Sequence, residues 1–296
     1  MDRFPFRRVA TRAIRRRSLL IGAATALGAQ GLIGCSAFGG GGVARWQARL
    51  TDDSIALLGE VHDNAELHRL RTAALRDALA RGWRPSVVME QFDVDRQDDL
   101  ERARRERPRD VRHLIEQAGG PRSGWSWPEY EPVLTMVLEH DLPLHAGNLG
   151  RAAASRIVRE GYAAVFSAAE IADLGLDRAP DAAVQRAQER EIDEGHCGAL
   201  PPALLPAMAR AQFARDAVMA QVVRRQIGRG VVLLAGNGHV RRDLGVARWL
   251  GSIERARVVA VGFVERGQEA ASEHFDALVI AAPAPRKDPC SGFVRS

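Results

Sequence analysis

Two stretches of the chain share one pattern, and together they decide the fold. The first is Ile55-Ala56-Leu57-Leu58-Gly59-Glu60-Val61-His62, and the second is Val231-Val232-Leu233-Leu234-Ala235-Gly236-Asn237-Gly238-His239. In each, a short apolar run ends in a Gly-x-x-His motif, and such a run is typical of a buried strand in a parallel sheet. Ligands bind at the carboxyl ends of parallel strands. Both motifs are therefore predicted to bring a histidine to that edge of the sheet.

Other apolar runs extend the pattern along the chain. Helical periodicity separates the early runs, over Ala65–Ala80 and again over Pro132–His140. A further helix is expected over Arg241–Leu250, just after His239. The alternation predicts an α/β fold with a mixed, mainly parallel central sheet flanked by helices. The additional strand-like runs are Ser86–Met89, Leu142–Ala146, Val258–Gly262 and Ala277–Ala281.

Two longer segments, about 95–130 and 168–228, do not fit simple crossovers between strands. Both are expected to be helical insertions that form a lid over the carboxyl ends of the strands. The predicted folded unit is a single α/β domain over residues 46–285, followed by a C-terminal tail over 286–296.

The first 34 residues have the composition of an export signal. Seven arginines precede an apolar stretch, Leu19–Leu32, that is too short to span a bilayer comfortably. Arg16-Arg17-Ser18-Leu19-Leu20 resembles a twin-arginine signal, and Leu32-Ile33-Gly34-Cys35 looks like a lipobox in which Cys35 is lipidated. An uncleaved signal anchor is the alternative. We expect an exported bacterial lipoprotein, anchored to a membrane of the cell envelope by Cys35 and a flexible tether over residues 35–45.

The charge of the chain is concentrated in this signal. The whole chain carries +5, whereas residues 1–34 contribute seven Arg and one Asp, a net +6, so the remainder carries −1. The basic balance therefore gives no reason to expect nucleic acid as a partner. With Cys35 lipidated, Cys197 and Cys290 remain. An exported context permits a disulfide between them, but the sequence alone does not establish it.

Polar side chains follow the predicted strands. Parallel strands would gather Glu60, His62, Glu90, Asn148 and His239 in one cleft. Histidine and carboxylate ligands suit a divalent metal such as Zn, Mn or Fe, and such a metal can turn a bound water into a nucleophile. The histidines and carboxylates of this cleft are therefore candidate metal ligands, and in a hydrolase Glu60 and Glu90 would be the catalytic carboxylates.

Structural roles compete with these functional ones. Glu60 could cap the helix that begins near Asn64, and a single histidine at a strand end is usually structural, although two in matching motifs favour a function. Glu90 is less ambiguous, because a carboxylate at the end of a buried strand needs a charged or donor partner. His68 is expected at the surface, and His145 is expected to be a hydrogen-bonded core residue.

Two segments of the predicted helical regions carry further candidates. Trp125–Pro132 concentrates aromatic residues before a helix and is interpreted either as packing under the lid or as a wall or ligand for a flat aromatic cofactor. Arg215 could anchor the lid or bind an anionic group such as a carboxylate. His196 and Cys197 could form a thiolate–imidazole pair, although adjacent residues rarely point at one another.

Taken in order, these motifs resemble the ChaN-type iron-regulated lipoproteins of the haem-binding uptake, Tiki superfamily. The resemblance covers about residues 46–285. It is carried by Gly59–Asp63, Met89–Phe92, Trp127–Pro132, Gly195–Gly198, Gln212 with Arg215–Ala220, and Gly236–Asp243.

The resemblance implies haem binding at a surface pocket or one shared in a homodimer, and a role in iron acquisition. In this chain His62, His239, Tyr130 and Arg215 become the candidate haem-binding residues, and Tyr130 and Tyr162 are its two tyrosines. Some Tiki relatives use two Gly-x-x-His motifs and a Glu for metal-dependent hydrolysis of a peptide, ester or amide. Carried over by position, this resemblance implies His62, His239 and Glu90 as the metal ligands of this chain. Three hypotheses follow: a membrane-tethered haem-binding lipoprotein, such a hydrolase, or a non-catalytic interaction protein.

Overall fold

The computed structural model describes residues 42–119, 124–288 and 290–291. The predicted signal peptide and the lipidated Cys35 lie outside these residues. Helix α1, Gly42–Gln47, begins within the last residues of the predicted tether. In the part of the chain that is described, no helix is both long and apolar enough to cross a membrane.

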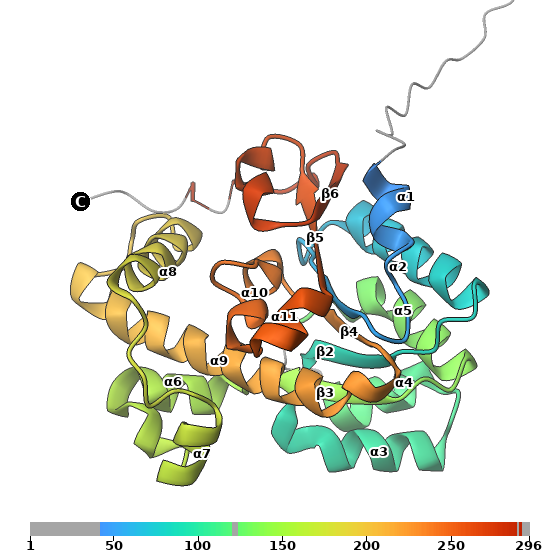
Figure 1. Cartoon of the computed structure of the whole chain (residues 1–296), viewed down its shortest axis with the longest axis horizontal. Coiled ribbons are helices and arrows are strands. Elements are labelled where there is room, and N and C mark those ends of the chain that lie inside the picture. The colour runs from blue at the N-terminus through green and yellow to red at the C-terminus, as the bar shows by residue number, and fades with distance from the viewer. Residues whose placement is uncertain (1–41, 120–123, 289, 292–296) are drawn as a thin grey trace, which may run out of the picture. The chain divides into compact units, whose positions relative to one another are not determined.

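Six strands form one sheet in the order β3-β2-β4-β1-β5-β6, and every pairing is parallel (Figure 1). The prediction of an α/β fold with a mainly parallel central sheet is confirmed. All six predicted strands are present, and β4 lies between β1 and β2. Their bounds are β1 Ile55–Leu58, β2 Ser86–Asp93, β3 Leu144–Asn148, β4 Val231–Leu234, β5 Val258–Glu265 and β6 Ala277–Ala281.

Helices bury both faces of the sheet, so the central strands are apolar throughout rather than alternating. In β1, Ala56 and Leu58 belong to one core cluster, whereas Ile55 and Leu57 belong to another. The first cluster lies under helices from the first half of the chain. Those elements are α2 Ala65–Ala80, α3 Gln97–Glu106, α4 Val111–Leu114, the π-helical turn η2 Ile115–Gly119 and α5 Trp127–Glu139. The 3-10 turn η1, Val94–Arg96, precedes α3.

The opposite face is covered mainly by the C-terminal half of the long helix α9, Leu205–Arg225. Met219, Ala220 and Val223 of this helix pack against Ile55, Val231 and their neighbours. Figure 1 shows α9 crossing β3, β2 and β4. Shorter elements complete this side: η5 Ile227–Arg229, α10 Asn237–Val240, η6 Val246–Trp249, α11 Ser252–Arg257 and η7 Glu269–His274.

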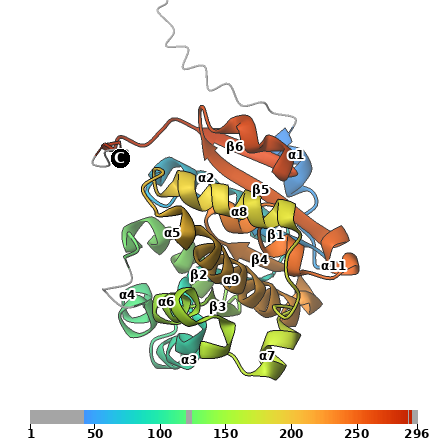
Figure 2. The ribbon, with the colours of Figure 1, turned by 90° about the vertical axis from the view of Figure 1, so that its left-hand side faces the viewer.

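A third core cluster joins the second predicted insertion, 168–228, to the elements just before it and lies around the N-terminal half of α9. Ile157, Leu174 and Phe213 are among its buried residues, and α8 packs along α9 (Figure 2). The elements of this helical layer are α6 Arg151–Glu160, η3 Tyr162–Ala164, α7 Ala168–Asp173, α8 Ala182–Gly195 and η4 Pro202–Leu204.

Two local predictions need correction. The segment 95–119 does not join that layer, because Leu100, Ala103 and Leu114 pack into the main core beside the sheet. Residues Arg241–Leu250 do not form one helix either. The short helix α10 begins before this range and contains His239, and only η6 follows, at Val246–Trp249.

Candidate functional site

The two Gly-x-x-His motifs pack directly on each other at the carboxyl ends of β1 and β4. The Asn237 backbone N–H donates to the Glu60 carbonyl at 3.2 Å. A Cβ at Gly59 would overlap the side-chain oxygen of Asn237, so only glycine permits this approach. The Asn237 side chain forms two hydrogen bonds with the backbone of Phe263 near the end of β5. Its amide donates to the Phe263 carbonyl at 2.7 Å, and its oxygen accepts the Phe263 N–H at 3.1 Å. The motifs therefore form one rigid unit.

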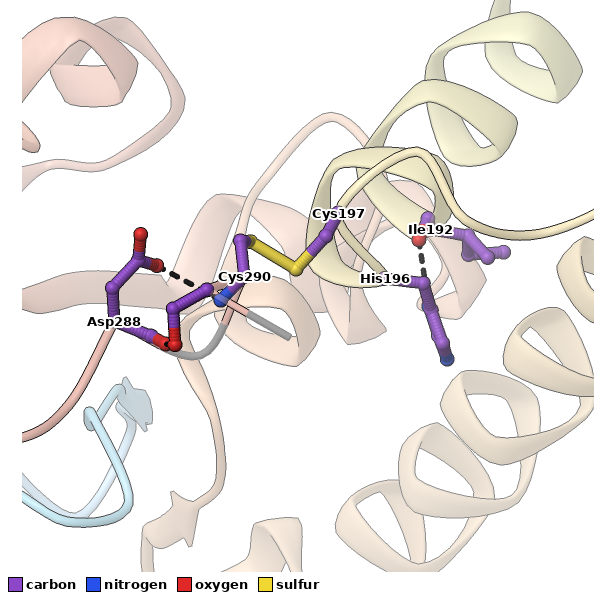
Figure 3. The surroundings of a disulfide bond; sticks show 6 residues. Ile192, His196, Cys197, Asp288 and Cys290 are labelled. Atoms are coloured by element: carbon purple, nitrogen blue, oxygen red, sulfur yellow. Dashed lines mark hydrogen bonds between the residues drawn. A yellow bond between two sulfur atoms is a disulfide. The ribbon is translucent and has the colours of Figure 1, made fainter. Parts of the chain in front are cut away.

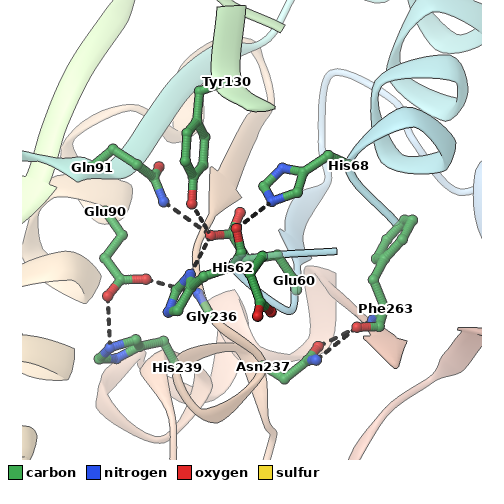
Figure 4. Close-up of polar contacts among 12 residues, drawn as sticks. Glu60, His62, His68, Glu90, Gln91, Tyr130, Gly236, Asn237, His239 and Phe263 are labelled. Carbon is green, nitrogen blue, oxygen red and sulfur yellow. Dashed lines mark hydrogen bonds and ion pairs between the residues drawn. The ribbon is translucent and has the colours of Figure 1, made fainter. Parts of the chain in front are cut away.

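Glu60 is the acceptor around which one half of the site is built (Figure 4). Its carboxylate receives Nδ1 of His62 at 2.5 Å, the hydroxyl of Tyr130 at 2.6 Å and the amide of Gln91 at 3.2 Å. Its second oxygen lies 2.5 Å from the guanidinium of Arg71. Burial alone would raise the pKa of Glu60, but Arg71 and His62 more than offset it and hold that pKa well below its usual range. Glu60 is therefore an anion held by three hydrogen bonds and one ion pair.

His62 is the accessible imidazole of the site. Its side chain is 51% exposed, and its ring meets Trp125 edge to face at 4.8 Å between centroids. Burial alone would lower the pKa of His62, but the hydrogen bond to Glu60 outweighs it and raises the pKa. With Nδ1 committed to Glu60, the other nitrogen faces Gly236, where a Cβ would come within 3.2 Å of it.

His68 lies behind this group and is buried, so the prediction of a surface position is wrong. Its Nε2 lies 3.2 Å from the His62 carbonyl, and its Nδ1 lies 3.2 Å from Arg71. Because Arg71 can only donate, Nδ1 accepts and Nε2–H donates. Burial, helped by the charge of Arg71, lowers the pKa of His68 to about 4, so the ring is neutral.

His239 forms the other half of the site and is enclosed by two carboxylates. Nδ1 lies 2.6 Å from Asp216 of α9, and Nε2 lies 3.3 Å from Glu90 at the end of β2. Glu90 also accepts the Gly236 N–H at 2.8 Å. Burial alone would lower the pKa of His239, but Glu90 and Asp216 raise it to about 10. Burial raises the pKa of Asp216 to about 6. At neutral pH the ring is an imidazolium that donates to both carboxylates.

A third polar group joins α9 to β3. Arg215 donates to the side-chain oxygen of Asn148 at 3.1 Å, and the Asn148 amide donates to Asp93 at 3.1 Å. Of the two roles predicted for Arg215, the contacts support anchoring of the helical layer. His145 differs from its prediction, because it is only partly buried and its Nε2 has no hydrogen-bond partner among the residues that the structure describes.

The cysteines lie in the helical layer and the tail (Figure 3). Cys197, just after α8, forms a disulfide with Cys290. His196 hydrogen-bonds through Nδ1 to the Ile192 carbonyl at 2.7 Å. A thiolate–imidazole pair is therefore absent from this part of the chain.

The structure brings Glu60, His62, Glu90 and His239 together, as the strand ends predicted. Tyr130 also reaches the site, but as a fully buried donor to Glu60, which leaves it no access to a surface ligand such as haem. Within the described residues, no group of three or more His, Cys, Asp or Glu side chains is arranged to hold a metal ion. Both nitrogens of His239, a predicted ligand, are already bonded to carboxylates.

Arg71 is a site residue that was not predicted from the sequence. Its position held a usable signal, because it lies four residues after Leu67 and four before Leu75, in the middle of the buried face of α2. A charged residue there requires a buried counter-ion.

Comparison with known proteins identifies the relatives of this fold. Residues 46–250 match the family described as haem-binding uptake, Tiki superfamily, ChaN. The chain belongs to this family.

The ChaN fold is also found among solved structures. One, described as cofacial haem binding to ChaN of Campylobacter jejuni, is 19% identical with a TM-score of 0.56, covering 75% of this chain and 84% of that one. The type III effector HopBA1 is 14% identical with a TM-score of 0.44, covering 83% of this chain and 95% of that one. Among curated protein sequences, none matches this ChaN-family chain.

Proposed function

We propose that this ChaN-family chain binds haem and serves iron acquisition as a lipoprotein tethered by Cys35 to a membrane of the cell envelope. Family membership over residues 46–250 supports haem as the ligand. The tether rests on the twin-arginine-like and lipobox motifs, which lie outside the described residues. The observation that carries the haem assignment is the environment of Tyr162 in the helical layer.

Tyr162 fits the needs of a haem ligand better than the residues predicted earlier. Its ring is half-buried among apolar side chains that are themselves partly exposed, including Val165, Phe166 and Met208. Within the described residues its hydroxyl has no hydrogen-bond partner. Burial raises the pKa of Tyr162 to about 12, and the charge of Arg210 opposes that rise. Burial outweighs Arg210, so the free hydroxyl is neutral, and Arg210 would help to stabilise the phenolate only once a metal ion has displaced its proton.

When bound, haem would supply an iron that a phenolate can ligate. Tyr162 would hold the iron, Arg210 would favour the anionic oxygen, and the partly exposed apolar side chains would face the macrocycle. Tyr130, His239 and Arg215 do not fit, because each is committed to the contacts described above. The C. jejuni relative binds haem cofacially. We extend this to a homodimer whose haem sites face each other.

The two tyrosines provide a matched test. Purified protein should be titrated with hemin while the Soret band is followed. Tyr162→Phe should lose the tyrosinate-type spectrum and bind far more weakly, whereas Tyr130→Phe should keep both. His140→Ala, which removes an exposed histidine away from the site, controls for non-specific binding. No Soret shift in the wild-type protein would refute haem binding. An unchanged spectrum in Tyr162→Phe would refute the ligand.

Metal-dependent hydrolysis is a second candidate, favoured by one observation. His62 and Glu90 both border Gly236, where a Cβ would lie 3.2 Å from His62 Nε2 and 3.7 Å from Glu90 Oε2. A cation there would require His239 to give up its bond to Glu90. Metal analysis of wild-type protein against His62→Ala tests this candidate, and equal stoichiometric metal in both would remove His62 as a ligand.

A further inference from the structure

The C-terminal tail lies against the turn that carries His62. We define the C-terminal strap as residues 282–288 together with Cys290. Just after β6, the Ala282 carbonyl accepts the side-chain amide of Asn64 at 2.9 Å. The Ala284 N–H donates to Glu265 at 2.8 Å, and the same Asn64 amide reaches Glu265 at 2.7 Å. The strap is therefore hydrogen-bonded to the end of β5 and to the turn after His62.

An arginine of the strap strengthens this attachment. Arg286 pairs with Asp63 at 2.7 Å and also contacts the Glu265 carboxylate. Glu265 is buried, so its charge needs a partner, and Arg286 provides the cation. Asp63 follows His62 directly in the chain. Within the described residues, Arg286 of the strap is thus the cation that pairs with Asp63 in the turn after His62.

The far end of the strap is tied covalently to the helical layer. The disulfide joins Cys290 to Cys197, which lies two residues after the end of α8, and the two positions are 93 residues apart in sequence. Helix α8 packs on α9, the helix that carries Asp216 and Gln212 against His239. The strap therefore connects the His62 turn to the helices that cover His239.

Helix α8 has a second attachment, to the other motif. Arg241, two residues after His239, is buried and pairs with Glu191 of α8 and with Asp243. This contact is an ion pair with a partly exposed glutamate, which holds α8 less firmly than a covalent bond. Release of the disulfide would leave α8 held to the motif region mainly by this ion pair and by its packing on α9.

We propose that the C-terminal strap is a thiol-controlled latch on the helical layer. In the oxidised state it holds the end of α8 to the His62 turn, and α9 keeps His239 covered. Reduction adds two electrons and two protons to the Sγ–Sγ bond and leaves two thiols, while a dithiol reductant is oxidised to its own disulfide. The freed α8 then moves away from the turn, which removes the covalent link between the helical layer and the segment that carries His62. This latch does not depend on which ligand the cleft or Tyr162 binds.

Hydrogen exchange of the full chain tests the latch. Oxidised wild-type protein should be compared with the same protein in dithiothreitol and with Cys197→Ser/Cys290→Ser. Reduction should raise exchange over residues 182–197 and 59–64, and it should leave the central strands β1 and β4 protected. Dithiothreitol should change nothing further in the double serine variant.

Two outcomes would overturn the proposal. Equal exchange over residues 182–197 in the oxidised and reduced states would show that the disulfide restrains nothing. Loss of protection in β1 and β4 would show that the bond supports the whole fold rather than a local latch. Arg286→Ala gives an independent check, because it should loosen residues 59–64 in the oxidised protein while residues 182–197 stay protected.

Discussion

The guanidinium of Arg71 lies 2.5 Å from the carboxylate of Glu60, and both side chains are only 1% exposed. An ion pair buried this deeply is costly to break from one side, because the remaining charge has no water to replace its partner. Glu60 is in turn the acceptor for His62 and Tyr130. The orientation of His62 therefore depends on Arg71, which lies on the following helix, α2.

Replacing Arg71 with Met should destabilise the fold by about 3–5 kcal/mol, the usual cost of leaving a buried charge unpaired. Arg69→Ala is the matched control, since Arg69 pairs with Glu66 on the exposed face of the same helix and should cost at most about 0.5 kcal/mol. Urea unfolding of both variants measures the difference. Equal losses would mean that Arg71 is no more important than a surface arginine.

His68 should make the fold sensitive to acid. Its folded pKa, about 4, lies below the ordinary value of 6.5, so the unfolded chain takes up the proton more readily. Its contribution to stability is complete above pH 6.5 and is lost as the pH falls toward 4, on the order of 3 kcal/mol in total. His68→Gln should lose less stability than wild type between pH 7 and pH 4. Parallel losses in urea midpoints would contradict the neutral, buried ring.

His239 should make the fold less stable at alkaline pH, whereas His68 makes it less stable at acidic pH. Its folded pKa, about 10, lies above 6.5, so its stabilisation is complete below pH 6.5 and declines as the pH rises to 10. Nitrogen chemical shifts should therefore report an imidazolium at pH 8. Asp216→Asn removes one of the two carboxylates and should lower the pKa of His239. A neutral His239 at pH 8 in the wild-type protein is the result that this account does not allow.

Gly59 should tolerate no side chain. In Gly59→Ala the new Cβ would overlap the Asn237 oxygen and press on Val240, so we expect a loss of about 1–3 kcal/mol or more, typical of overpacking. Gly195→Ala is the control, because a Cβ there meets nothing within 4 Å. Thermal unfolding should separate the two. If Gly59→Ala unfolds like wild type, the motifs do not pack as described.

Much of the fold could be predicted because its signals are local. The apolar runs located all six strands, and periodicity located α2 at Ala65–Ala80. The ends of β1, β2 and β4 then predicted that Glu60, Glu90 and His239 would meet, since parallel strands end at one edge. Strand order was not predictable in this way, because no local pattern states that β4 lies between β1 and β2.

The partners within the site were less predictable than its members. Tyr130 was read as a surface ligand, yet α5 turns it inward to Glu60. His68 was placed at the surface because a single histidine on a helix carries no sign of burial. Its neutral state depends on Arg71 and on the His62 carbonyl, which only the folded chain brings to it. Long-range contacts of this kind leave no trace in local spacing.

The strand order also sets the time at which the site can form. Residues 55–58 and 86–89 do not pair with each other, because residues 231–234 fill the position between them. A nascent chain that has reached only residue 230 has its first histidine motif but lacks the strand that joins its two earliest strands. Such long-range pairing forms late in folding. Ligands that need both motifs can therefore load only after nearly the whole chain has been synthesised.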